Sequence, residues 1–182
     1  MSEPHPVLRN ADLAGRPVAQ ADRAQFTAVY GHLFDHSPWV VERAWEKRPF
    51  LDASALHGAF LSVIAEAAPE ERLSLAQAHP ELADKVAMAR GLTQDSAREQ
   101  AGAGLDRLSE EEYRMFDSLN RSYRERHGFP FIICVKLHDK AAILDALRQR
   151  AGRDSAEELD EAMAQVGLIS RLRLADLAGR PA

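Results

Sequence analysis

The stretch SEEEYRMFDSLNRSYRERHG, residues 109–128, carries the clearest helix signal of the chain and points to the class of fold. Ser109 stands where an N-cap is expected, and Glu112 follows three residues later, which is the spacing of a capping box. Gly128 comes directly after the periodic part, where a left-handed residue commonly closes a helix. A helix between these signals is predicted, with one face formed by Tyr113, Phe116, Leu119, Asn120 and Tyr123.

Seven further segments show apolar periodicity or helix-start signals, and only one run resembles a strand. The seven begin after Asp22, after Ser37, near 52, at Pro69, at Thr93 or Ser96, near 140, and after Asp154 or Ser155. The strand-like run FPFIICV, residues 129–135, contains Pro130, which disfavours a central sheet position. A buried extended loop is therefore expected there.

These patterns predict an all-α fold, a single compact bundle-like domain of about eight helices over residues 22–182. Ala, Leu, Glu and Arg are prominent while Val and Ile are scarce, which also favours helices. Residues 1–21 contain three of the nine prolines and little periodicity, so an irregular N-terminal arm is expected. A chain of 182 residues can bury one core without disulfides or a structural metal.

Composition and motifs exclude several classes of function. The net charge is −5 with no basic block, which argues against nucleic acid as the main partner, and no run of about 18 apolar residues predicts a membrane span. The single cysteine, Cys134, permits no intrachain disulfide and favours a cytoplasmic protein. No phosphate loop or dinucleotide fingerprint is present, and His32 and His36 have no third ligand, so neither a cofactor nor a metal is expected.

Two short motifs could carry chemistry or could merely shape helix ends. Pro80 forces His79 out of the helical conformation, which can direct the imidazole toward a cleft, although a histidine at a helix C-terminus is also a common dipole partner. Ser96 and Glu99 form an S-x-x-E pattern. If the helix begins at Ser96 they are a capping box, whereas if it begins at Thr93 they share one face and could both contact a ligand.

Arg173 stands out because it continues an apolar stripe. Ala162, Val166 and Ile169 recur at helical spacing, and the next member of the series is this arginine. A guanidinium on a core-facing stripe needs a carboxylate, either from the protein or from a substrate. On spacing alone an internal ion pair is slightly favoured.

Several segments together resemble one family, the 2-oxo-4-hydroxy-4-carboxy-5-ureidoimidazoline (OHCU) decarboxylases of urate breakdown. The segments are HSPWVVERAWEKRPF, AHPELADK, TQDSAREQAGAGL, SYRERHGFPFIICVK and RLRLADL, and the resemblance runs from about residue 25 to 178. It implies an all-helical, cofactor-free, usually homodimeric enzyme that performs the third step from urate to (S)-allantoin. Its partner would be the small-molecule substrate OHCU.

The resemblance also implies the roles of individual residues. Catalysis would rest on His79 and Glu99. The substrate contacts carried over from the family motifs are Pro80, Ser96, Glu99, Gln100, Phe131, Ile132, Ile133, Cys134, Val135 and Arg173. Decarboxylation pushes an electron pair onto the ring, so a site needs donors for the developing anion and a group such as His79 that moves a proton. Which substrate group Arg173 would meet is left open, since a tight grip on the leaving carboxylate opposes CO₂ loss.

Two other readings compete with the decarboxylase. One is a relative that uses a different ureido or imidazolinone substrate. The other is a non-catalytic helical interaction module, in which His79 ends a helix, Ser96 and Glu99 cap one, and Arg173 pairs internally.

Overall fold

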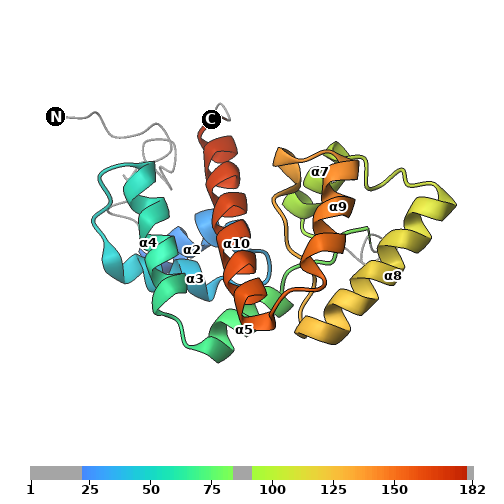
Figure 1. The fold of residues 1–182 in the computed structure, drawn as a ribbon. Helices are drawn as coiled ribbons and strands as arrows, with labels where there is room; N and C mark the ends of the chain where they lie inside the picture. The colour runs from blue at the N-terminus through green and yellow to red at the C-terminus, as the bar shows by residue number, and fades with distance from the viewer. Residues whose placement is uncertain (1–21, 84–91, 180–182) are drawn as a thin grey trace. The chain divides into compact units, whose positions relative to one another are not determined.

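The computed structural model describes residues 22–83 and 92–179, and in this part of the chain the fold is all-α. Eight α-helices occur in the described residues, as predicted, together with three 3₁₀ helices that were not predicted (Figure 1). They are α2 (Arg23–Tyr30), η2 (Gly31–Phe34), α3 (Trp39–Ala44), η3 (Trp45–Lys47), α4 (Ala53–Glu66), α5 (Pro69–Gln77), α7 (Gln94–Gly102), α8 (Glu110–His127), η4 (Val135–Leu137), α9 (Lys140–Arg150) and α10 (Ser155–Gly179). The arm predicted over residues 1–21 lies outside the described residues.

Capping signals in the sequence fix most helix starts. The Asp22 carboxylate accepts a hydrogen bond from the Gln25 backbone, and Ser109 and Glu112 make both bonds of a capping box. Gly128 ends α8 in the left-handed conformation at φ 78°, where a side chain would be strained. The predicted extent of α8 is therefore confirmed, and α5 also begins at Pro69 and ends before Pro80 as predicted.

The start of α3 differs from the prediction by one residue. Pro38, in place of Ser37, is the N-cap, and no side chain caps the helix. Ser37 instead donates its backbone N–H to Phe34 O at 2.9 Å, so it belongs to the turn that follows η2. The preceding 3₁₀ helix, which the apolar pattern did not reveal, has moved the start of the helix.

Within the all-α fold two compact units can be distinguished, and the first comprises residues up to 68 together with residues from 167 onward. Its helices α2 and α4 both pack against α3, and α2, α3 and α4 appear as neighbours in Figure 1. The core of this unit is aromatic. Phe26 lies 4.9 Å from Tyr30 and 5.3 Å from Trp45, measured between ring centroids, and Phe34 packs edge-on against Phe60.

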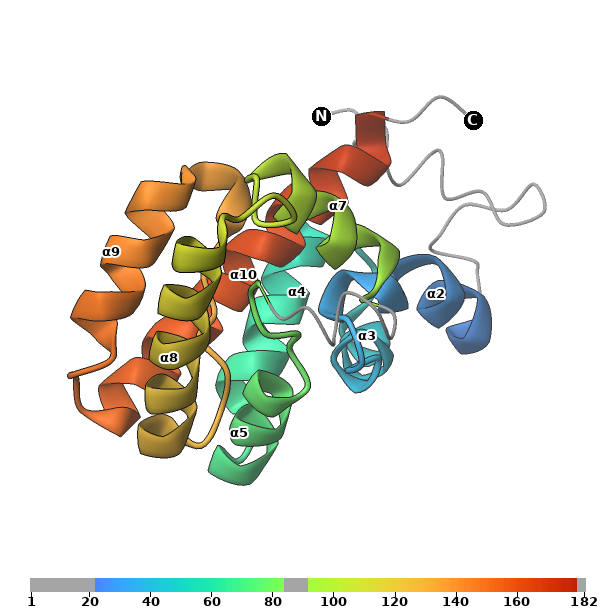
Figure 2. The same cartoon turned by 90° about the vertical axis from the view of Figure 1, so that its right-hand side faces the viewer.

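The second unit comprises residues 69–166. Helices α8 and α9 pack side by side, as both views show, and η4 packs against α7 (Figure 2). Between α8 and η4 the run 129–135 is buried at every position and forms neither a helix nor a strand before Val135. The predicted buried loop is confirmed. None of the helices in the described ranges is both long enough and apolar enough to cross a membrane.

The capping box gives a direct test of how much one local signal stabilises the fold. Replacing Ser109 by Ala removes the acceptor for the Glu112 backbone N–H, and we expect a loss of about 1 kcal/mol in the free energy of unfolding. Ser118, which is exposed within α8, provides the control, because Ser118→Ala should be neutral or slightly stabilising. Urea denaturation of both variants measures this, and equal effects would contradict the capping argument.

Candidate active site

His79 lies where helix α5 ends, as the position of Pro80 predicts. The helix stops at Gln77, and the His79 backbone N–H donates to Ala76 O at 3.2 Å in a final tight turn. The Gln77 side chain donates to Gly128 O at 3.0 Å, which ties this end of α5 to the end of α8. The His79 side chain is partly exposed.

The three residues after His79-Pro80 are fastened to two other helices. Gln100 of α7 accepts a hydrogen bond from Ala83 N at 3.0 Å and donates to Glu81 O at 3.3 Å. Asn120 of α8 donates to Leu82 O at 2.8 Å. Both side chains are buried, and the bonds to Ala83 N and Leu82 O are shielded from competition with water. Neighbouring helices thus hold the loop that leaves the histidine.

Helix α7 settles the alternative that the S-x-x-E pattern left open. Thr93 is its N-cap and accepts from Ser96 N, so Ser96 and Glu99 do not form a capping box. Both residues lie inside the helix three positions apart, on one face. Ser96 is buried, the Glu99 side chain is only 9 % exposed, and Lys136 Nζ lies 3.8 Å from the Glu99 carboxylate.

The segment Phe131–Val135 leads toward the same helix, because η4 begins at Val135 and packs against α7. Two of its backbone groups are held by side chains. Arg150 Nη1 donates to Ile132 O at 2.9 Å, and Cys134 N donates to Gln165 Oε1 at 2.9 Å. Cys134 itself is buried and belongs to no disulfide, as expected.

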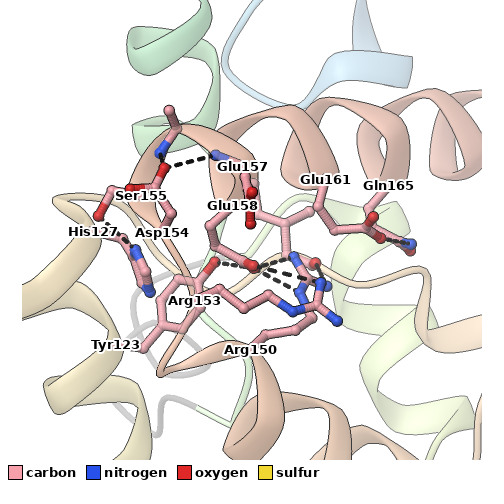
Figure 3. A network of polar contacts seen from close by, with 12 residues as sticks. Tyr123, His127, Arg150, Arg153, Asp154, Ser155, Glu157, Glu158, Glu161 and Gln165 are labelled. Atoms are coloured by element: carbon pink, nitrogen blue, oxygen red, sulfur yellow. Dashed lines mark hydrogen bonds and ion pairs between the residues drawn. The ribbon is translucent and has the colours of Figure 1, made fainter.

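The arginine that holds Ile132 O belongs to a buried charge cluster (Figure 3). Glu158 is fully buried, and its Oε1 accepts hydrogen bonds from Arg150 Nε at 2.6 Å and from Tyr123 Oη at 2.7 Å. Arg153 reaches the other carboxylate oxygen only at 3.9 Å. Burial, followed by the hydrogen bond to Glu158, raises the pKa of Tyr123 far above its ordinary value, so the phenol stays a donor.

Arg173 belongs to the first compact unit and forms an ion pair with a protein carboxylate there. Its Nη1 donates to Asp35 Oδ2 at 3.0 Å and to Leu33 O at 3.3 Å. Both charged side chains are almost completely buried, at 2 % and 1 % exposure. The sequence argument that this guanidinium needs an acid is confirmed, and the internal ion pair that spacing favoured is present.

The described ranges also bear on metal binding. No cluster of three histidine, cysteine or acidic residues there could hold a metal ion. His32 and His36, which have helical metal spacing in the sequence, are both exposed.

The residues behind the segment, Arg150, Glu158 and Gln165, were not identified from the sequence, although a signal for two of them exists. Stepping back four residues from Ala162 along the stripe that exposed Arg173 leads to Glu158. Arg150 likewise continues the buried series Ile143, Leu147 of α9. Charges near helix ends are usual, which hides both anomalies.

The fold and these residues define a class: an all-α protein in which a histidine at a helix end, a serine–glutamate face and a fastened peptide segment lie in one compact unit. Comparison with known proteins makes the assignment specific. The model of the family "OHCU decarboxylase" matches residues 19–175, which include parts of both units. The chain belongs to the OHCU decarboxylase family.

Individual relatives agree with the family match. The chain is 38 % identical over 165 residues to a 2-oxo-4-hydroxy-4-carboxy-5-ureidoimidazoline decarboxylase of Haloferax volcanii, covering 91 % of this chain and 96 % of that protein. It is 37 % identical to the protein of the same name from Halalkalicoccus jeotgali, over 87 % and 88 %. A crystal structure of (S)-allantoin synthase superposes with a TM-score of 0.68 at 25 % identity, covering 88 % of this chain and 52 % of that one.

The loop after His79 provides a test of the site's construction. Asn120→Ala leaves Leu82 O buried without its donor, so we expect a loss of about 1–3 kcal/mol in the free energy of unfolding. The neighbouring Arg121 makes an exposed pair with Asp117, and Arg121→Ala should cost no more than about 1 kcal/mol. Urea denaturation compares the two variants. Equal losses would mean that the Asn120 bond does not hold the loop.

A second test concerns pH. Burial lowers the pKa of His127 below 6.5, and the smaller effect of Glu158 opposes this. The unfolded chain therefore binds the proton more readily than the native state, so stability should fall as the pH drops below 6.5. Thermal unfolding between pH 6.5 and about 5 should show a shallower decline for His127→Asn than for the wild type. Parallel declines would contradict a neutral buried His127.

Proposed function

We propose that this chain decarboxylates OHCU to (S)-allantoin, the third step from urate, and that His79 moves the proton in this reaction. The observation that carries the proposal is the family match over residues 19–175, a range that contains each residue expected at the site. Relatives that are 37 % and 38 % identical to this chain over the aligned residues bear the name of this activity. The reaction is a carbon–carbon lyase step.

The chemistry requires three things of the protein. The bond between the ring carbon and its carboxylate breaks, CO₂ leaves, and the electron pair moves into the ring. Donors must stabilise that charge, and a proton must then reach one face of the ring carbon that carries the ureido group. Delivery to one face produces a single enantiomer, whereas reaction in water gives both.

The roles proposed for the side chains are those that the family resemblance implies. His79, partly exposed beyond the end of α5 and followed by the fixed backbone of Pro80, exchanges the proton. Glu99 and Ser96 share one face of α7, where the carboxylate can accept hydrogen bonds from ureido or ring N–H groups or orient the imidazole. Gln100 is proposed with them as a substrate contact, and its amide also holds the loop after His79 through the backbone of Glu81 and Ala83.

The peptide groups of Phe131–Val135 supply donors that need no side-chain reorganisation, because the segment is buried and fastened. Arg173 is proposed as an anchor for an anionic or carbonyl group of the substrate. Its ion pair with Asp35 fixes one edge of the guanidinium and thereby its orientation. No cofactor enters the scheme.

Of the competing readings, the interaction module is weakened by one observation. It requires Ser96 and Glu99 to cap α7, yet Thr93 performs that function. A relative with a different ureido substrate remains an outcome of the assay. We also propose a homodimer in the cytoplasm, as in the family pattern, with the reduced Cys134 in keeping with that compartment.

The decisive experiment follows OHCU generated in situ from urate by the two preceding activities. We expect the wild-type protein to accelerate its loss and to give a circular-dichroism signal of one allantoin enantiomer. His79→Ala should lose this acceleration by about 100-fold or more, because the proton-transfer group is removed.

The matched control is His36→Ala, an exposed histidine outside the proposed site, which should retain wild-type turnover. Native-like far-ultraviolet circular dichroism of both variants excludes loss of fold. Full activity of His79→Ala would refute the role of this histidine. Racemic product at the spontaneous rate from the wild type would refute the function itself.

A further inference from the structure

The buried cluster around Glu158 calls for an explanation beyond stability. A buried ion pair is weak support for a fold, since its desolvation offsets most of the attraction and apolar substitutes are often as stable. Arg150 and Glu158 have side chains only 6 % and 0 % exposed. What an arginine supplies that an apolar residue cannot is a rigid planar fork with several donors at fixed angles.

The fork of Arg150 joins two different parts of the second unit. Its Nε donates to Glu158 Oε1 of α10 at 2.6 Å, and Nη2 lies 2.6 Å from the same oxygen. The remaining nitrogen, Nη1, donates to Ile132 O at 2.9 Å. The guanidinium also stacks over the Phe131 ring, with 4.6 Å from Cζ to the ring centroid. The carboxylate on α10 thus sets the direction of a carbonyl in the segment 131–135.

A second contact from α10 acts two residues further along the segment. Gln165 stands seven positions after Glu158, two helical turns on and on the same face of α10. Its Oε1 accepts the Cys134 N–H at 2.9 Å, while its Nε2 donates to Glu161 at 2.8 Å and so keeps the amide from turning over. Ile132 O and Cys134 N are therefore both hydrogen-bonded to side chains, the first to one of α9 and the second to one of α10.

Peptide geometry then determines the direction of the residue between them. In a trans peptide the C=O of one residue and the N–H of the next point in opposite directions. Because Ile132 O points to Arg150, Ile133 N–H points away from it. Because Cys134 N–H points to Gln165, Ile133 O points away from that side as well. Each polar group of Ile133 is thus turned away from the side chain that holds the other end of its peptide.

We propose that Arg150, held by Glu158, and Gln165 are positioning residues for the decarboxylation, which present the Ile133 peptide groups to the substrate. The inference rests on the proposed function and deepens it, because it says which side chains fix the direction of a backbone donor. A donor fixed before the reaction costs no reorganisation when charge develops, and small errors in its direction reduce the rate. Neither side chain needs to touch the substrate.

The test compares two substitutions that disturb the same cluster. Arg150→Lys keeps the positive charge beside Glu158 but cannot hold the carboxylate and Ile132 O in one planar fork. Tyr123→Phe removes a hydrogen bond to the same carboxylate and leaves the Arg150–Ile132 contact in place. With OHCU generated in situ, well below both unfolding temperatures, we expect Arg150→Lys to lose about tenfold or more in kcat with KM nearly unchanged.

Tyr123→Phe should lower the unfolding temperature by a similar amount yet keep kcat within about twofold of the wild type. Wild-type kcat in Arg150→Lys, or losses of kcat in both variants that simply follow their unfolding temperatures, would overturn the positioning role.

Gln165→Met supplies an arm that does not depend on the buried pair, because the residue is only half-buried and the change keeps its length. We expect faster hydrogen exchange at the Cys134 amide and a several-fold lower kcat. Unchanged kcat would overturn the proposal even if Arg150→Lys does not fold. An inactive wild type would refute the proposed function, whereas the exchange rate still reports whether Gln165 holds the segment.

Discussion

The second compact unit depends on the hydrogen bonds that the guanidinium of Arg150 makes. This group donates hydrogen bonds to one buried carboxylate and to one backbone carbonyl. These bonds connect α9, α10 and the loop between α8 and η4. Without the guanidinium, Glu158 would be a buried charge whose only close donor among the described residues is Tyr123 Oη, and such a defect is among the costliest in a core. The segment 131–135 takes its direction from this arrangement.

The same principle recurs around His79, where neutral amides replace charges. Gln100 and Asn120 are buried, and their side-chain amides hydrogen-bond to the backbone of residues 81–83. Ala83 adopts a φ of 57°, which is uncommon for a residue other than glycine, so the loop is held in a conformation that it would not prefer alone. In both places buried side chains fix the backbone beside groups that are proposed to contact the substrate.

The sequence predicted what is local and missed what requires partners far away in the chain. Asp22, Ser109 and Gly128 announce helix ends because capping depends on residues within four positions, and all three behave as predicted. Ser37 failed as an N-cap because an unforeseen 3₁₀ helix precedes it. Whether Thr93 or Ser96 begins α7 could not be decided, since both are good caps.

For the site, periodicity revealed Arg173 and its need for an acid, but not that Asp35, 138 positions earlier, supplies it. The link from Gln165 to Cys134 leaves no trace in any local pattern, because a half-buried glutamine within a helix is ordinary. The family resemblance pointed to the segment 131–135, and the structure adds what holds it.

The most direct test of this account is a crystal structure of the protein with (S)-allantoin, the proposed product. The account predicts that the ligand lies beside His79 and the Ser96–Glu99 face, with Ile133 N–H donating to a ligand carbonyl and Ile132 O still on Arg150. A product bound away from His79, or an Ile133 N–H that points to protein while the ligand is in place, would contradict it.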